Sequence, residues 1–167
     1  MIHLVASAQR LPAPLPLTSA PRGVAVLLNA RAKAVNAQVR RTLAEVVPHE
    51  DLYLSHGEPE AAEIADWVVA RRYQTVFTGG GDGTFVTWVN RIVDAAERRH
   101  QRAPRFGVLA LGTGNAVAEL VGATPRRHVR DLSRFLSGQV PDTRRIDLVT
   151  CEGRRTPFAG VGVDAAI

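Results

Sequence analysis

The stretch Thr75-Val76-Phe77-Thr78-Gly79-Gly80-Gly81-Asp82-Gly83-Thr84 decides the fold of this chain. Its first four residues are mostly β-branched or apolar, which is typical of a strand buried inside a sheet. The glycines that follow predict a tight loop whose backbone can approach another group closely. Residues 85–99 then carry apolar side chains at helical spacing. We therefore predict a strand, a glycine-rich loop and a helix in direct succession.

The same alternation of strand and helix recurs on both sides of this stretch. Apolar runs predict further strands at residues 24–28, 52–54 and 106–111, and helical periodicity predicts helices at residues 35–46, 59–72 and 131–136. The strand at 106–111 leads into a second glycine-rich loop, Gly112-Thr113-Gly114-Asn115. Alternation of this kind predicts an α/β fold with an open, mainly parallel sheet and helices on both faces.

The two ends of the chain differ from its middle. Residues 1–22 hold four prolines and lack the continuous apolar segment of a signal peptide, which predicts a flexible tail. Residues 23–143 are expected to form one domain. Apolar runs on either side of Glu152-Gly153 predict a hairpin, so we expect residues 144–167 to begin a second, β-rich domain.

Composition excludes several classes of protein. Hydrophobic residues make up 46% and charged residues 22%, which is ordinary for a globular protein, and no apolar run is long enough to cross a bilayer. The single cysteine, Cys151, forms neither an internal disulfide nor a metal site with other cysteines, which favours a reducing, cytoplasmic setting.

Basic residues outnumber acidic ones by 21 to 16, and the excess includes two arginine clusters. The clusters are Arg98, Arg99, Arg102 and Arg105, then Arg126, Arg127, Arg130 and Arg134. Such clusters bind phosphate in nucleic acids or in anionic membranes, although solvated helix faces are the simpler interpretation. Neither the two tyrosines nor the two tryptophans alternate with the arginines, so the stacking surface of a single-stranded nucleic-acid binder is missing and we predict no nucleic-acid partner.

Both glycine-rich loops follow strands, and ligands of parallel sheets bind outside the carboxyl ends of the strands. A glycine-rich loop at a helix start favours an anion such as phosphate. Asp82 would repel phosphate unless Mg²⁺ lies between them, or unless it binds a hydroxyl or a water. The alternative is a tight turn in which Asp82 caps the helix. The dinucleotide and P-loop fingerprints both fail, because Thr84 and Val117 replace required small residues and no lysine follows either loop.

Residues 78–84 together with Leu111-Gly112-Thr113-Gly114-Asn115 resemble the catalytic domain of diacylglycerol kinases and bacterial lipid kinases. NAD kinases and 6-phosphofructokinases share this superfamily, but NAD kinases normally lack the second loop. The resemblance implies ATP and Mg²⁺ as cofactors, with Asp82 as the metal residue. It assigns nucleotide binding to Asn29, Ser55, Gly79, Gly80, Gly81, Asp82, Gly83, Thr84, Gly112, Thr113, Gly114 and Asn115.

The chain departs from the family pattern in its first loop, which reads Asn29-Ala30-Arg31-Ala32-Lys33 where the family has Asn-Pro-x-Ser/Ala-Gly. Direct charge from Arg31 or Lys33 would then replace backbone contacts to phosphate. The family's catalytic base lies in its second domain, so the resemblance implies a base beyond Ile167 and little activity from residues 1–167 alone.

We therefore expect an ATP-dependent kinase that acts on a diacylglycerol-like lipid at the inner membrane surface. A second copy or another chain could supply the missing domain. Two alternatives stay open: a nucleotide-binding module without catalysis of its own, and an NAD kinase-like enzyme.

Overall fold

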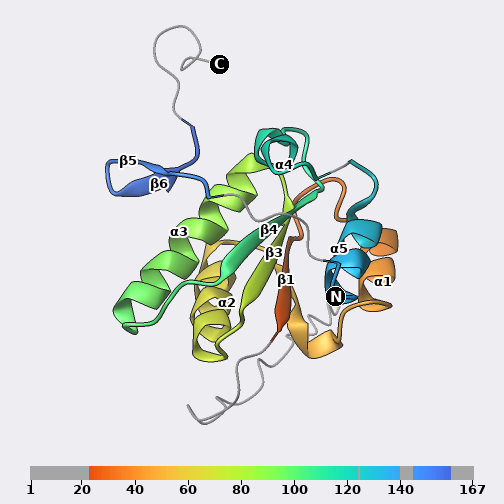
Figure 1. Ribbon diagram of the computed structural model, residues 1–167, viewed down its shortest axis with the longest axis horizontal. Coiled ribbons are helices and arrows are strands. Elements are labelled where there is room, and N and C mark those ends of the chain that lie inside the picture. The colour runs from red at the N-terminus through yellow and green to blue at the C-terminus, as the bar shows by residue number, and fades with distance from the viewer. Residues whose placement is uncertain (1–22, 124, 140–144, 159–167) are drawn as a thin grey trace, which may run out of the picture.

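The protein is described here by a computed structural model that covers residues 23–123, 125–139 and 145–158. The predicted tail at 1–22 and the chain after Phe158 lie outside the described residues. Four strands form a parallel sheet in the order β2-β1-β3-β4 (Figure 1). Their bounds are β1 Val24–Asn29, β2 Leu52–Ser55, β3 Thr75–Gly80 and β4 Arg105–Ala110.

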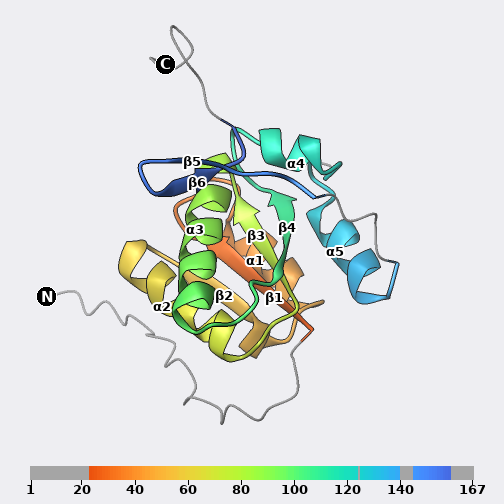
Figure 2. The same cartoon turned by 60° about the vertical axis from the view of Figure 1, so that its left-hand side comes forward.

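Helices cover both faces of this sheet, as the alternation of elements predicts. Successive strand residues point to opposite faces, so β1 contributes Ala25 and Leu27 to one core and Val26 and Leu28 to the other. The first core includes residues of α2 (Glu58–Ala70) and α3 (Asp82–Arg98). The second includes residues of α1 (Ala37–Ala44) and α5 (His128–Leu136), and Figure 2 shows the layers from another side. The α/β fold is confirmed.

Three short elements complete the described chain. A single 3-10 turn, η1 (His49–Asp51), precedes β2, and α4 (Ala116–Leu120) follows the second glycine-rich loop. Strands β5 (Val149–Cys151) and β6 (Arg154–Thr156) form an antiparallel hairpin. Its turn residues Glu152 and Gly153 both have positive φ, as a two-residue hairpin turn of type I′ requires.

The guanidinium of Arg155 and the side-chain amide of Asn90 attach this hairpin to α3. The Arg155 guanidinium lies 2.6 Å from Asp94 Oδ1 and 2.8 Å from Glu97 Oε1. The Asn90 side chain donates to the carbonyl of Arg155 and accepts from its amide, each at 2.8 Å. The hairpin is therefore held against α3 by the ion pairs of Arg155 and by two hydrogen bonds between the Asn90 side chain and the Arg155 backbone.

The boundary between β3 and α3 differs from the expected one. The strand continues through Gly79 and Gly80, and the helix starts at Asp82 and not at Phe85. Gly81 is thus the one glycine of the run that lies between the two elements. Because the composition of residues 79–84 resembles a loop, sequence periodicity placed the helix start three residues too late.

The imidazole of His128 at the start of α5 predicts a pH dependence of stability. Its Nδ1 is buried without a hydrogen-bond partner among the described residues. Burial lowers the pKa of His128 below the usual 6.5, while the nearby charge of Asp131 acts in the opposite direction. The unfolded chain therefore takes up this proton first as the pH falls, and the folded state loses stability below the unfolded pKa.

We expect the thermal midpoint of the wild type to fall more than that of a His128→Gln variant between about pH 7.5 and about pH 5.5. Melting curves recorded by circular dichroism at both pH values measure the difference. Equal losses in the two proteins would show that His128 does not contribute to the acid sensitivity.

Candidate functional site

A cleft lies at the carboxyl ends of the strands, where the predicted polar and glycine residues of the site meet. It consists of two adjoining hollows of about 190 and 480 Å³, which share Asn29, Arg31, Gly83 and Thr84. The larger volume falls within the range of about 300–1,000 Å³ typical of small-molecule sites. Hereafter these two hollows are called the strand-end cleft.

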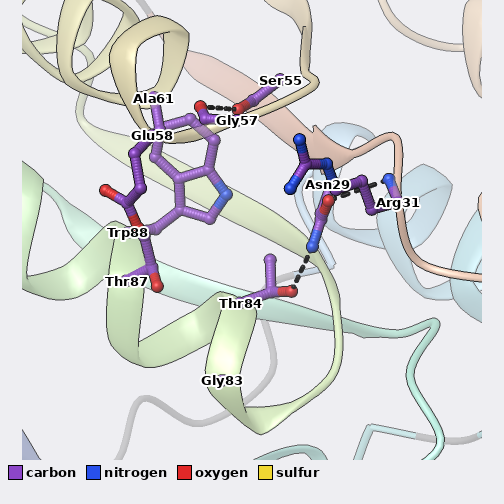
Figure 3. Close-up of a pocket in the computed structure, with 10 residues that line it drawn as sticks. All are labelled: Asn29, Arg31, Ser55, Gly57, Glu58, Ala61, Gly83, Thr84, Thr87 and Trp88. Atoms are coloured by element: carbon purple, nitrogen blue, oxygen red, sulfur yellow. Dashed lines mark hydrogen bonds between the residues drawn. The ribbon is translucent and has the colours of Figure 1, made fainter.

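Asn29, the last residue of β1, connects the first loop to the start of α3. Its Nδ2 donates to the Thr84 hydroxyl at 3.1 Å, and its Oδ1 accepts from the amide of Arg31 at 2.9 Å (Figure 3). The Asn29 side chain thereby fixes the position of Arg31 relative to the first turn of α3. Ser55, the last residue of β2, lines the same hollow while its hydroxyl donates to the Gly57 carbonyl.

The two glycine-rich loops touch backbone to backbone. A β-carbon on Gly112 would lie 2.1 Å from the Gly81 Cα, and one on Gly81 would lie 2.9 Å from the Gly114 carbonyl oxygen. The amide of Asp82 donates to that same carbonyl at 3.2 Å. Only glycine allows this approach, so the prediction that the two loops lie side by side is confirmed.

Not every glycine in the first loop is required by packing. A β-carbon at Gly79 would lie 2.4 Å from Leu28, and one at Gly80 would lie 2.4 Å from the Thr84 hydroxyl. At Gly83, by contrast, a β-carbon would meet no heavy atom within 4 Å. Gly83 is exposed, lies in the first turn of α3 and lines both hollows. The protein's own packing therefore does not explain a glycine at this position, and the missing side chain leaves the backbone open to close approach.

The Asp82 carboxylate reaches from the first loop to the helix after the second loop. Its Oδ2 accepts from the Ala116 amide at 3.1 Å, and its Oδ1 accepts from the Val117 amide at 3.0 Å. These amides belong to the first turn of α4, where a helix leaves its N–H groups without internal acceptors. The capping alternative expected for Asp82 therefore holds for α4, the neighbouring helix, and not for α3, whose cap residue is Gly81.

The second loop is closed by its own asparagine. Asn115 accepts from the Gly112 amide at 3.1 Å and donates to the Gly112 carbonyl at 2.7 Å. This ring of two hydrogen bonds fixes the loop, and it leaves Gly112 and Thr113 on the lining of the larger hollow. Asn115 therefore shapes the site without lining it.

Two cations line the cleft. Arg31 lines both hollows and Lys33 lines the larger one, and both side chains are exposed. Neither forms an ion pair within residues 23–123, 125–139 and 145–158. Next to the N-terminus of α3, whose helix dipole also favours negative charge, these two cations make the cleft suitable for an anion.

Sequence reasoning missed one wall of the smaller hollow. It is formed by Gly57, Glu58 and Ala61 from the start of α2, and by Thr87 and Trp88 from α3, as Figure 3 shows. The Trp88 ring is almost fully buried, and the Glu58 carboxylate pairs with Arg91 at 2.5 Å. Trp88 follows Thr84 by four residues, so the helical face shared with Thr84 was the available signal.

The structure thus separates the predicted site residues into two groups. Seven line the cleft: Asn29, Ser55, Gly81, Gly83, Thr84, Gly112 and Thr113. Five do not, and their visible roles are in strand packing or in joining the two loops: Gly79, Gly80, Asp82, Gly114 and Asn115.

A site for Mg²⁺ built from protein side chains alone is not found among the described residues. No three His, Cys, Asp or Glu side chains converge there to hold a metal ion. Mg²⁺ is commonly held by one or two carboxylates together with the substrate's phosphates, and each oxygen of a carboxylate has two lone pairs. Each Asp82 carboxylate oxygen accepts one amide and keeps a second lone pair. This single carboxylate therefore suits a Mg²⁺ ion that arrives with a phosphate ligand, and does not suffice for a metal site made of protein side chains alone.

Comparison with protein families gives one match. Residues 24–151 match the family described as the diacylglycerol kinase catalytic domain, which covers the sheet, both glycine-rich loops and β5. A comparison with curated protein sequences gave no match. Among the helices described, none is long and apolar enough to cross a membrane.

Proposed function

We propose, because the chain belongs to the diacylglycerol kinase catalytic domain family, that it binds ATP in the strand-end cleft and transfers the γ-phosphate to the hydroxyl of a diacylglycerol-like lipid. Membership supports a kinase-like function. The nucleotide, the lipid and the residues that bind them form the proposal.

The observation that carries this proposal is the open space at Gly83. A glycine that packing does not require, at a helix start and beside two cations, suits a phosphate that contacts the backbone. In this arrangement the amides of Gly83 and Thr84 in the first turn of α3 bind the phosphates, and Arg31 and Lys33 neutralise their charge. Phosphoryl transfer depends mainly on positioning and on charge neutralisation, which are the two things these groups provide.

Mg²⁺ would accompany the nucleotide and stabilise charge on the transferred phosphate. We propose Asp82 as the protein's candidate ligand, since it belongs to the loop between two residues that line the cleft, Gly81 and Gly83. Its hydrogen bonds to α4 give it a second, structural role. Substitution of Asp82 can separate the two roles.

An Asp82→Asn variant keeps the shape of the side chain but loses its charge. We expect its affinity for a non-hydrolysable ATP analogue to fall about tenfold in the presence of Mg²⁺ and to change little in its absence. Isothermal titration with and without Mg²⁺ measures both affinities. A loss of about 1 kcal/mol of stability, with equal affinity changes under both conditions, would leave Asp82 with the capping role alone.

The group that accepts the proton of the lipid hydroxyl is a separate question. Glu58 is the one carboxylate on the lining of the cleft among the described residues, and it is paired with Arg91. We therefore propose that Glu58 is not the base, and that residues 1–167 bind nucleotide far better than they transfer phosphate. Phosphate transfer to diacylglycerol in mixed micelles measures the activity, and rapid turnover lost in a Glu58→Gln variant would contradict this assignment.

A further inference from the structure

The arginines of α5 form a stripe that the proposed chemistry does not use. Arg130 and Arg134 lie four residues apart, on one face of the helix, and both are exposed. Leu132 lies between them in sequence, is fully buried and belongs to the core under the sheet. The arginine face therefore points away from the core. Arg126 and Arg127, also exposed, extend the positive charge just before the helix.

This positive surface has few opposing charges. Residues 125–139 contain four arginines and a single acidic residue, Asp131. Arg134 donates to the neutral side chain of Gln139 at 3.2 Å, and it forms no ion pair within the part of the chain that the structure describes. The sequence alone favours a solvated helix face for these arginines. The structure adds two exposed apolar side chains just before them, which a solvated helix face does not require.

Two large apolar side chains are exposed directly before the arginines. Leu120, the last residue of α4, is 46% exposed and Val121 is 39% exposed. Gly122 follows with positive φ and ends the helix. Exposed apolar residues flanked by arginines are typical of segments that enter the boundary between lipid headgroups and acyl chains.

The position of this surface relates it to the strand-end cleft. α4 follows the second glycine-rich loop directly and lies beyond the carboxyl end of β4. α5 begins at His128, shortly after α4 ends at Leu120, and lies beside α1 (Figure 1). The other arginine cluster runs from the last residue of α3 to the first residue of β4, at the opposite edge of the sheet. There Arg98 and Arg99 share Asp66 as a partner, at 3.1 and 3.8 Å.

We propose that the surface formed by Leu120, Val121, Arg126, Arg127, Arg130 and Arg134 docks the protein onto an anionic lipid bilayer. The arginines bind the headgroups, and the two apolar side chains enter the interface. The inference rests on the proposed function, since a kinase of membrane lipids must bring its cleft to a bilayer. A lipid surface accounts for the apolar residues, whereas phosphate contacts to a nucleic-acid duplex would leave them without a role. Stacking of single-stranded bases would need exposed aromatic side chains, and Phe135 instead packs against Phe77.

Vesicle sedimentation tests the proposal without nucleotide or lipid substrate. The 167-residue chain should bind vesicles of phosphatidylcholine and phosphatidylglycerol, bind pure phosphatidylcholine weakly, and dissociate in high salt. An Arg130→Glu/Arg134→Glu variant should bind the anionic vesicles at least about 30-fold more weakly, because each arginine near a membrane contributes about a fivefold factor. A Leu120→Ser/Val121→Ser variant should bind more weakly while keeping the salt dependence.

The matched control is an Arg102→Glu/Arg105→Glu variant, which makes the same charge change at two exposed arginines of the opposite edge. It should retain most of the binding. Equal loss in the two charge-reversal variants would overturn the proposal, as would tighter binding to a DNA or RNA oligonucleotide than to the vesicles. Titration of all variants with the ATP analogue separates the two proposals: intact nucleotide binding with no vesicle binding refutes the docking surface alone.

Discussion

A Gly112→Ala variant is expected to lose about 3 kcal/mol of unfolding free energy, at the upper end of the usual cost of overpacking. The added methyl group would lie 2.1 Å from the Gly81 Cα and 2.4 Å from its nitrogen. Both neighbours are backbone atoms between a strand and a helix, so neither can rotate away. The two loops must separate, and the hydrogen bonds from Ala116 and Val117 to Asp82 weaken with them.

Urea denaturation of the variant measures this loss, and Gly83→Ala provides the control. At Gly83 the methyl group enters open space within the first turn of a helix, so stability should stay the same or rise by up to about 1 kcal/mol. The same control should nevertheless weaken binding of the ATP analogue. A loss below about 1 kcal/mol for Gly112→Ala would contradict the backbone contact between the loops.

An Arg31→Glu variant is expected to bind the ATP analogue about 100-fold more weakly than the wild type. Arg31 lines both hollows, and its backbone amide donates to Asn29 Oδ1 at 2.9 Å. Reversing its charge replaces attraction to phosphate by repulsion at short range, and solvent exposure of the site limits the effect to roughly 3 kcal/mol.

Arg40→Glu is the matched control for this charge reversal. Arg40 is exposed on α1 and does not line the cleft. Its variant should bind the analogue within about threefold of the wild type, because screening removes most of a distant charge. Similar losses in both variants would indicate a general effect of net charge and would remove Arg31 from the site.

Sequence periodicity predicted the layers of the fold because each apolar stripe has a definite period. The runs at 24–28 and 75–78 are apolar on both faces, as central strands of a parallel sheet must be. The start of α3 could not be found in this way. Asp82 and Gly83 have poor helical propensity, and they are helical because the strand directs the chain into that turn.

The residues of the cleft that lie at the ends of neighbouring strands could be predicted from the sequence. Contacts between segments far apart in the chain could not. Gly83 and Thr113 could be assigned because each lies in a glycine-rich loop that follows a strand of the same sheet, and Asn29 through the resemblance to the family. The partners of Asp82 lie 34 and 35 residues further along the chain, so its bonds to α4 depend on how the loops pack. Trp88 was missed because an apolar residue at helical spacing is assigned to the core, and its ring is indeed almost fully buried.

The measurement that tests the central proposal most directly is the change in backbone amide chemical shifts when the Mg²⁺ complex of a non-hydrolysable ATP analogue is added to the isotope-labelled protein. The largest changes are expected at Arg31, Gly81, Gly83, Thr84 and Thr113, which line the strand-end cleft. The α5 amides of residues 128–136 should stay unchanged and serve as an internal control. No shift changes at saturating nucleotide, or changes that cluster at the opposite edge of the sheet around Arg102 and Arg105, would contradict the assignment of this cleft to ATP.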